Sequence, residues 1–182
     1  MTTGNPTRRS LLRASAGLAA GTRVLPAPGL LPTVPFGPTR ITRLLLGSNP
    51  FNGFAYSLPS LSRHMKEWFT PERIAAVLAS AERHGINTWQ FSFYESSMAG
   101  LKLHREAGGK LQWLLVTGGA MKDNLGLMAE TARLKPLGIV HHGGVTDQRF
   151  RAGQMAKVRD YLKAVRDTGV MVGLSTHLPR VI

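Results

Sequence analysis

The segment that decides the fold, residues 70–93, reads TPERIAAVLASAERHGINTWQFSF. It opens with a helix start signal, in which Thr70 can cap the helix, proline takes the first helical position and an acid follows. Apolar side chains then recur on one helical face, at Ile74, Val77, Leu78 and Ala81. Gly85 is placed to end the helix, and the apolar run over residues 86–93 is typical of a strand buried on both faces. The segment therefore predicts a helix that leads directly into a buried strand.

The same alternation extends along the chain in both directions. Short, continuous apolar runs predict further strands at residues 44–46, 111–117, 138–142 and 170–175. Between them, helices are predicted over residues 101–106, over residues 125–134 before Pro136, and over residues 155–165 before Gly169. The strands recur roughly every 30 residues, which is the length of a βα unit. Five strands and four helices are thus expected after residue 40.

Buried strands separated by helices predict an α/β fold with a parallel sheet, and a (β/α)8 TIM barrel is favoured over a Rossmann fold. A Rossmann fold requires G-x-G-x-x-G after its first strand. Residues 47–53 occupy that place and read GSNPFNG, in which the glycine spacing differs and Pro50 lacks an amide proton. Because a barrel needs eight units, residues 41–182 are expected to form its N-terminal half. Such an incomplete barrel is expected to be a fragment, or to associate through its open sheet edges.

The beginning of the chain has the features of an export signal. Residues 7–13, TRRSLLR, resemble the twin-arginine (Tat) signal, with Arg8 and Arg9 as the pair that the Tat translocase recognises. A weakly apolar stretch and a proline-rich segment over residues 26–40 follow. The resemblance implies a periplasmic or secreted protein in which residues 1–35 are the signal peptide and a linker. A disordered basic N-terminus is the alternative, since no small-x-small cleavage site is clear.

The composition excludes several classes of function. The 182 residues include 23 Lys and Arg against 10 Asp and Glu, which gives a net charge of +13. The basic residues are scattered and do not alternate with aromatic ones, so nucleic-acid binding is not expected. Cysteine is absent, which excludes disulfides, thiolate metal sites and cysteine nucleophiles. No apolar run is long enough to span a membrane, and no transmembrane segment is predicted.

Polar residues and glycines follow the predicted strands, at the end where barrels hold their catalytic groups. We expect catalytic roles for His142, His177, Gln90 and Glu95. Substrate binding is expected from Asn49, Asn52, Ser92, Thr117, Gly143, Gly144 and Thr176. Neighbouring residues on a strand point to opposite faces, so only one of His141 and His142 faces the barrel axis. We expect it to be His142, because the two glycines that follow allow a ligand close to the backbone.

The two catalytic histidines lie at the ends of neighbouring predicted strands, and their role stays open. His142 and His177 could share a divalent metal, with Gln90, Glu95 or Asp147 completing the shell. Such a metal would activate water or polarise a substrate oxygen. Without a metal, they could act as acid–base or ligand-binding groups, or only pack structurally. The remaining histidines, His64, His84 and His104, are expected at the surface.

Residues 44–179 resemble the aldo-keto reductases, which are TIM-barrel enzymes. The likeness rests on Gly85-Ile86-Asn87 before a strand, after a helix that opens Thr70-Pro71-Glu72. It implies carbonyl reduction with NAD(P), but the chain departs from the family's catalytic pattern. Gln90 takes the place of the family's Asp, Glu95 that of its Tyr, with Tyr94 one residue away, and Thr117-Gly118 that of its Lys; the histidine is His141 or His142. NAD(P) is therefore less expected than a metal.

A nearer likeness is to an uncharacterised group of bacterial barrel proteins, some of them exported. Its motifs are N-P-F-x-G at residues 49–53, H-G-G-V at 142–145 and T-H-x-P at 176–179. Three functions remain open on the sequence. The first is an exported enzyme of isomerase, lyase or hydrolase type that acts on a carbohydrate-like or other small polar substrate, with or without a metal. The others are a reductase-like oxidoreductase and an inactive fragment or binding module.

Overall fold

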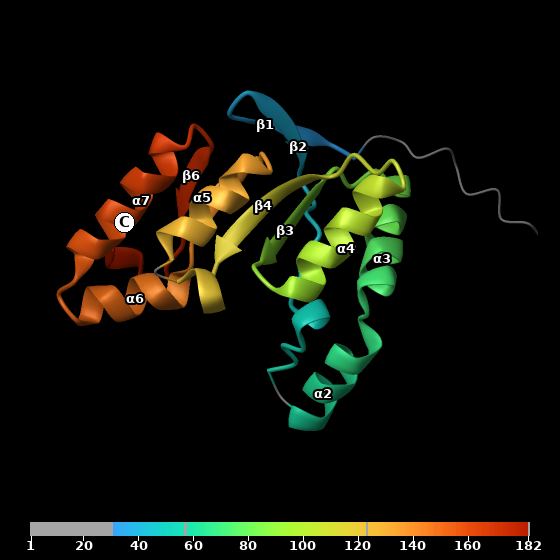
Figure 1. The fold of residues 1–182 in the computed structure, drawn as a ribbon, viewed down its shortest axis with the longest axis horizontal. Coiled ribbons are helices and arrows are strands. Elements are labelled where there is room, and N and C mark those ends of the chain that lie inside the picture. The colour runs from blue at the N-terminus through green and yellow to red at the C-terminus, as the bar shows by residue number, and fades with distance from the viewer. Residues whose placement is uncertain (1–30, 57, 123, 182) are drawn as a thin grey trace, which may run out of the picture.

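The fold is mixed α/β and contains a four-stranded parallel sheet (Figure 1). The computed structural model describes residues 31–56, 58–122 and 124–181, so the predicted export signal with Arg8 and Arg9 lies outside the described residues. The strands follow one another in chain order: β3 (Thr88–Ser92), β4 (Gln112–Thr117), β5 (Gly138–His141) and β6 (Met171–Leu174). These four strands and their parallel pairing confirm the corresponding predictions.

The first predicted strand, over residues 44–46, is wrong. Only Leu46 pairs with the sheet, through an isolated parallel bridge to Trp89. Its amide donates to the Thr88 carbonyl at 3.0 Å, and its carbonyl accepts from the Gln90 amide at 2.8 Å. Before it, the Thr42 hydroxyl donates to the Leu44 carbonyl at 2.7 Å. That local bond bends the chain at Leu44 and prevents a longer strand.

Four helices confirm the predicted ones: α3 (Pro71–Arg83), α4 (Glu95–Glu106), α5 (Leu125–Arg133) and α7 (Met155–Asp167). The predicted start of α4 at residue 101 is wrong, because that helix begins at Glu95. Two helices were not predicted: α2 (Pro59–Trp68), which buries none of its residues, and α6 (Gly143–Arg151). The start of α6 escapes prediction because glycine is a poor helix former. Short 3-10 turns complete the fold: η1 (Pro50–Asn52), η2 (Gly119–Met121) and η3 (Pro179–Val181).

The proline-rich segment contains a hairpin where a linker was predicted over residues 26–40. Strands β1 (Thr33–Phe36) and β2 (Thr39–Thr42) pair antiparallel. Gly37 makes the turn possible with φ of 55°. Prolines are tolerated here because one occupies the turn and the other an edge strand. The folded part of the chain therefore begins before residue 41, where the barrel segment was expected to start.

The hairpin lies across the amino ends of the sheet strands (Figure 1). The Arg40 carbonyl accepts bonds from the Asn87 amide side chain at 3.0 Å and from the Gln112 amide side chain at 2.9 Å. Gln112 also accepts from the Thr39 hydroxyl at 2.8 Å. On the far side, Gly37 lies so close to the Met171 side chain that a Cβ there would be 2.5 Å from Sδ. The hairpin thus contacts residues next to β3, at the start of β4 and at the start of β6.

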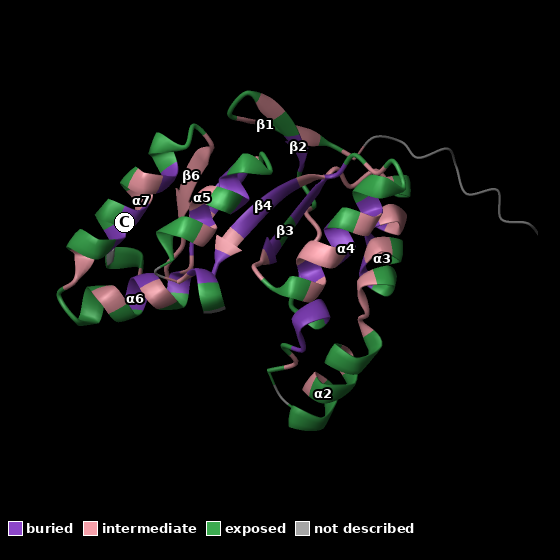
Figure 2. Cartoon of the chain, viewed as in Figure 1, coloured by how far each residue is buried: buried purple, intermediate pink, exposed green. Residues whose placement is uncertain are grey.

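The hydrophobic core lies between one face of the sheet and the helices (Figure 2). Trp89, Phe91 and Leu115 point to that face and are at most 1% exposed. They meet apolar side chains of α3, α4, α5 and α7, namely Ile74, Leu78, Leu101, Met128, Tyr161 and Val165. Burying each large apolar side chain stabilises the fold by about 1.5–3 kcal/mol. The alternate residues on the strands point to the opposite face, where Gln90 is exposed.

His104 was expected at the surface, and that expectation is wrong. It is 2% exposed, and its Nε2 lies 3.0 Å from Glu82 Oε2, which ties α4 to α3. Gly109 passes directly over the ring. His64 and His84 are exposed, as expected. Among the described residues, the structure contains no helix that is both long and apolar enough to cross a membrane.

Candidate functional site

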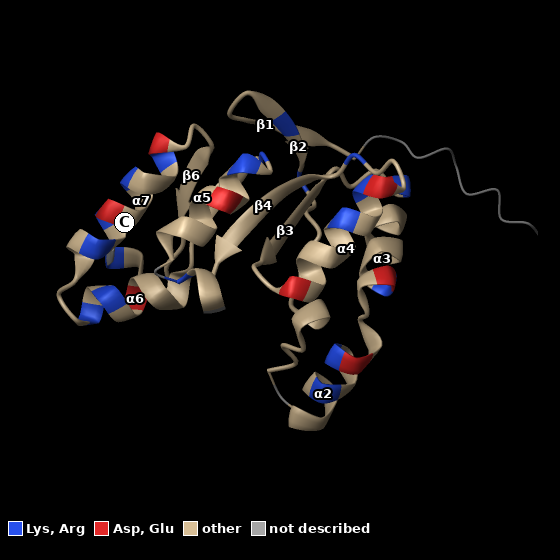
Figure 3. Cartoon of the chain, viewed as in Figure 1, with Lys and Arg blue, Asp and Glu red and all other residues tan. Residues whose placement is uncertain are grey.

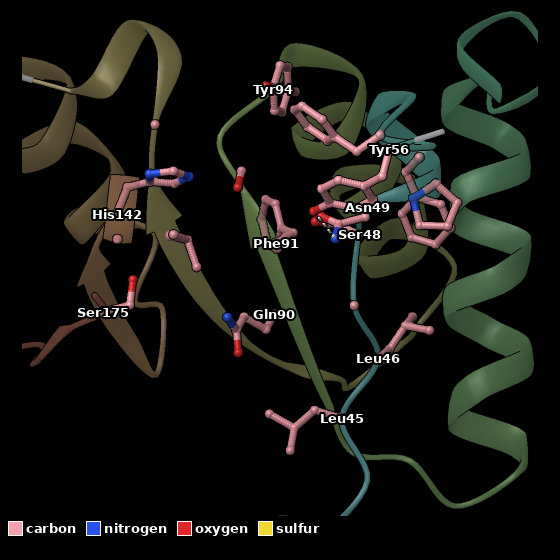
Figure 4. Close-up of a pocket in the computed structure, with 18 of the residues that line it drawn as sticks. Leu45, Leu46, Ser48, Asn49, Tyr56, Gln90, Phe91, Tyr94, His142 and Ser175 are labelled. Atoms are coloured by element: carbon pink, nitrogen blue, oxygen red, sulfur yellow. Dashed lines mark hydrogen bonds between the residues drawn. The ribbon is translucent and has the colours of Figure 1, made fainter. Parts of the chain in front are cut away.

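A cavity of about 1040 Å³ opens at the carboxyl ends of the parallel strands. One wall comes from the loop that follows Leu46 and includes Asn49 and Tyr56 (Figure 4). The opposite wall comes from the start of α6 and the loop after β6, with His142 and Ser175 (Figure 4). Gln90 on β3 lies between the two walls. The cavity is therefore built from chain segments that meet only in the folded protein.

The structure brings most of the predicted site residues to this cavity. Those that line it are Asn49, Gln90, Ser92, His142, Gly143, Thr176 and His177. Gly143 leaves room for its neighbours, since a Cβ there would lie 3.2 Å from Cε1 of His177. The first residue of α6 therefore has to be small to leave the His177 ring in its place.

The other predicted site residues do not line the cavity. Asn52 is buried and accepts a bond from the Ser97 hydroxyl at 3.1 Å, which holds its loop against α4. Thr117 is buried and accepts from the backbone amide of His142 at 3.3 Å. Gly144 also contacts His142, through its amide. Glu95 is exposed in the first turn of α4, where an acid complements the helix dipole.

His142 caps the amino end of α6 and turns its ring into the cavity (Figure 4). Its Nδ1 accepts a hydrogen bond from the Gly144 amide at 3.1 Å. In the neutral ring, the proton therefore lies on Nε2. Burial, and secondly the nearby His177, lower the pKa of His142, while Asp147 acts in the opposite sense. At neutral pH, His142 is thus an uncharged donor through Nε2–H.

His141 points to the other face of the sheet. Its Nδ1 lies 2.7 Å from the Thr146 hydroxyl, and its ring meets Tyr161 of α7 edge-on, with the ring centroids 5.4 Å apart. His141 is 3% exposed. The division between a cavity-facing His142 and a helix-facing His141 follows the predicted alternation along the strand.

His177 is held by the carboxylate of Asp147. Its Nδ1 lies 2.7 Å from Asp147 Oδ2, and its backbone amide lies 3.2 Å from both carboxylate oxygens. Thr176 donates its hydroxyl to Asp147 Oδ1 at 2.5 Å. Asp147 is 4% exposed, whereas the side chain of His177 is 76% exposed. In the neutral ring of His177, Nδ1–H donates to the carboxylate and Nε2 carries the lone pair that can accept.

Asp147 stays ionised because several donors converge on it. The Thr176 hydroxyl lowers the pKa of Asp147 most, and the bonds and charge of His177 lower it further, against the effect of burial. The two histidines therefore present complementary atoms. His177 offers an acceptor at Nε2, while His142 offers a donor at Nε2–H.

The two histidines differ in how well they fit a divalent metal. His177 fits, because metal-bound histidines commonly donate their other N–H to a carboxylate. His142 as placed does not fit, because its neutral ring carries a proton on the nitrogen that would bind the metal. Among the described residues, no group of three His, Cys, Asp or Glu side chains is arranged to hold a metal. A metal stays a prediction, and no chemical step proposed below depends on it.

Five aromatic residues that line the cavity were not predicted as site residues. Phe51 and Phe91 are buried, whereas Phe54, Tyr56 and Tyr94 are exposed. Phe54 and Tyr94 meet edge-on with centroids 6.2 Å apart. Tyr56 accepts a bond from the Asn49 side chain at 3.0 Å and has φ of 57°, which is unusual for a residue other than glycine. The sequence offered one signal for them, because Tyr94 lies one residue before the predicted site residue Glu95. In the structure Tyr94 lines the cavity and Glu95 does not.

Comparison of the chain with protein-family models, with curated proteins and with solved structures finds no match. The functional proposals below therefore depend on the geometry and chemistry of the chain's own residues.

Proposed function

We propose that the sheet is part of the wall of a (β/α)8 barrel. The strands lie in chain order, and the helices that share their core pack on one face. Right-handed crossovers place all the helices on one face when each new strand is added at the same edge of the sheet. In a doubly wound sheet the strand order reverses, and helices cover both faces. The uncovered face then corresponds to the barrel interior, and the hairpin covers its amino end. The cavity lies at the end where barrels keep their catalytic groups.

The protein is, in this proposal, an exported enzyme that moves protons on a carbohydrate-like or other small polar substrate. The observation that carries the proposal is the complementary pair of histidines. Asp147 holds His177 as a proton acceptor, and Gly144 holds His142 as a proton donor. An acceptor and a donor in one open cavity are what general acid–base chemistry requires. This is isomerase, lyase or hydrolase chemistry, and it needs no metal.

In the reaction step, His177 Nε2 takes a proton from a substrate C–H next to a carbonyl. The electron pair of that bond moves towards the carbonyl oxygen, to which His142 donates its Nε2–H hydrogen bond. The Asp147 carboxylate stabilises the resulting imidazolium without taking the proton. In an isomerisation, His142 gives its Nε2 proton to the carbonyl oxygen and takes the proton of the neighbouring hydroxyl, while His177 returns its proton to the former carbonyl carbon. In an elimination, the proton on His177 is delivered to the departing group. Thr117, Gly144 and Thr176 act as positioning residues for these groups.

Exchange with deuterium tests this step without knowledge of the product. The full-length protein is incubated in D₂O with aldoses, ketoses and hydroxy acids, and proton NMR follows loss of the signal next to the carbonyl. We expect exchange with the wild type and a loss of at least about 10²-fold in His177→Ala. His84→Ala, at an exposed position, is the matched control and should exchange at the wild-type rate.

The outcome that contradicts the proposal is equal exchange in His177→Ala and the wild type, or none with any compound. A saturable quench of nicotinamide fluorescence would favour the reductase-like alternative. Export is tested separately, by replacing Arg8 and Arg9 with lysine in a Tat-competent bacterium. We expect the periplasmic fraction to fall to background, since the paired arginines form the recognised motif of the signal.

A further inference from the structure

The described residues that line the cavity carry no formal charge, although the chain is strongly basic. The sequence contains 23 Lys and Arg. None of the described residues that line the cavity is Lys, Arg, Asp or Glu. The basic residues instead lie on the outer helices, the hairpin and the loops (Figure 3). Asp147 lies beneath the lining, where it is buried and occupied by Thr176 and His177.

This distribution bears on the charge of the ligand. Sites for phosphate or carboxylate groups use Arg or Lys, because charge-assisted hydrogen bonds offset the loss of the anion's hydration. Sites for cationic ligands use carboxylates for the same reason. A chain so rich in cations, with none among the described residues of its large cavity, is suited to an uncharged ligand.

The aromatic wall bears on the shape of the ligand. Phe54 and Tyr94 are 42% and 37% exposed, so their rings present apolar surface to the cavity. Tyr56 is held beside them by Asn49 in an unfavourable backbone conformation. Strained residues persist when their surroundings impose them, and they concentrate at functional sites. A flat apolar wall of this kind suits a ring with an apolar face.

The remaining lining supplies neutral hydrogen-bonding groups. Gln90 and Asn49 contribute amides, each with a donor end and an acceptor end. Ser92 and Ser175 contribute hydroxyls. Such groups match the hydroxyls around a sugar ring, because each hydroxyl can both donate and accept a hydrogen bond. His142 lies on the wall opposite Tyr56 (Figure 4), and His177 lines the same cavity.

We propose that the cavity binds an uncharged sugar in its cyclic form, a free monosaccharide whose ring opens to provide the carbonyl of the proposed step, and not a sugar phosphate or a sugar acid. The apolar face of the ring lies against Tyr94 and Phe54, and its hydroxyls meet the amides of Gln90 and Asn49. The cavity volume of about 1040 Å³ is ample for one or two sugar units. This inference rests on the proposed function, since it names the substrate class of the same site.

Calorimetry on the full-length protein tests the ligand class. Glucose, galactose, xylose and methyl glucoside are compared with glucose 6-phosphate and glucuronate. We expect saturable binding of at least one neutral sugar and at least tenfold weaker binding of its charged counterpart. Tyr94→Ala should weaken the neutral sugar by about tenfold, because a ring contact is lost, while Tyr94→Phe stays within about twofold. Phe150→Ala removes an aromatic exposed elsewhere and should leave binding unchanged.

A second measurement covers the case in which Tyr94→Ala does not fold. Saturating the aromatic protons of the wild type should transfer magnetisation to the C–H groups on one face of the bound sugar. Tighter binding of the phosphate or the acid, or transfer to both ring faces equally, overturns the inference. So does catalysed exchange confined to charged or acyclic compounds, which would leave the proposed proton transfer intact. Binding of a neutral sugar by His177→Ala without exchange in the wild type would uphold the inference and contradict the proposed function.

Discussion

The two ends of the parallel sheet differ in charge and in closure. At the carboxyl ends, the cavity is open and its described lining is neutral. At the amino ends, the hairpin covers the sheet, and a second cavity of about 690 Å³ includes four cationic side chains, Arg105, Lys110, Arg133 and Lys135. The same chain therefore places charge in one cavity and keeps it out of the other.

The helices explain the charged end. The helices α4 and α5 end there, and Arg105 and Arg133 lie in their last turns. Cations at helix carboxyl ends offset the negative end of the dipole, and Arg105 also donates to the Leu111 carbonyl at 2.5 Å. The cations at this end therefore have a structural reason. At the other end, His142 caps α6 and His177 pairs with Asp147, and both residues also line the open cavity. The polar groups at the carboxyl end are therefore accessible to a ligand.

The largest expected effect tests the carboxyl end. Asp147→Asn should lower the deuterium exchange rate by about 10²–10⁴-fold, because an amide can donate to His177 and favours the wrong tautomer. The variant should still fold, since an amide oxygen can replace one carboxylate acceptor. Exchange rates and circular dichroism measure the two effects. An Asp147→Asn protein with the wild-type rate would remove the functional distinction between the two ends.

The next effect tests the tight packing near the amino end. Gly109→Ala should destabilise the protein by about 3 kcal/mol, because the new Cβ would lie 2.1 Å from Cε1 of the buried His104. Gly47→Ala is the control, since a Cβ there meets nothing within 4 Å. Urea denaturation measures both variants. Equal midpoints for the two would show that the His104 contact contributes nothing to the closed end.

A smaller effect is expected at the hairpin. Gln112→Ala removes the two side-chain bonds that join β4 to Thr39 and Arg40. The expected loss is about 1–2 kcal/mol, given roughly 0.5–1.5 kcal/mol for each bond. The affinity of the carboxyl-end cavity for its ligand should not change. A variant whose ligand affinity fell with its stability would mean that the two ends are coupled.

The smallest effect is a dependence of stability on pH. The pKa of folded His142 is lowered, so the unfolded chain takes up a proton more readily near the ordinary histidine value of about 6.5. Unfolding then binds a proton, and stability falls as the pH drops below about 6.5 towards the folded pKa. His142→Gln should remove this slope, and the same replacement of His64, exposed on α2, controls for loss of a histidine.

Asp147 acts in a separate and more acidic range. Because its folded pKa is lowered, its contribution is complete above the ordinary aspartate value of about 3.9. That contribution is lost as the pH falls towards the lowered value. His142→Gln should retain this acid-range loss of stability, and urea midpoints across the pH range separate the two slopes. A single slope removed entirely by His142→Gln would contradict the separate contribution of Asp147.

Local patterns in the sequence were sufficient for much of the fold. The helix start at Thr70 was readable because the capping group lies three residues from its partner, and its hydroxyl accepts from the Arg73 amide in the structure. The buried strands could be predicted because strands covered on both faces appear in the sequence as short, continuous apolar runs. The hairpin was not, since residues 33–42 are held by Asn87 and Gln112, which lie far along the chain.

The candidate site shows the same limit. The polar residues at strand ends could be predicted, because parallel strands all end at one edge of the sheet. Glu95 and Tyr94 could not be separated, because the point at which α4 begins decides their directions: Tyr94 is the extended residue before the helix and Glu95 is its first residue. His104 could not be recognised as buried, because its partner Glu82 belongs to a different helix. Sequence reasoning predicts which residues lie near the edge, and packing decides which of them face it.

The sequence by itself determined helices α3, α5 and α7, the presence of α4, the four parallel strands, the end of the sheet that carries polar groups, and the opposite facing of His141 and His142. Those features depend on periodicity and on neighbours within a few residues. Only the tertiary structure decided that Asp147 pairs with His177, that Phe54, Tyr94 and the two histidines line one cavity, and that its described lining carries no formal charge. The physical reason is that hydrogen bonds and burial act between atoms that are close in space. Residues 147 and 177 are brought together only where α6 meets the loop after β6.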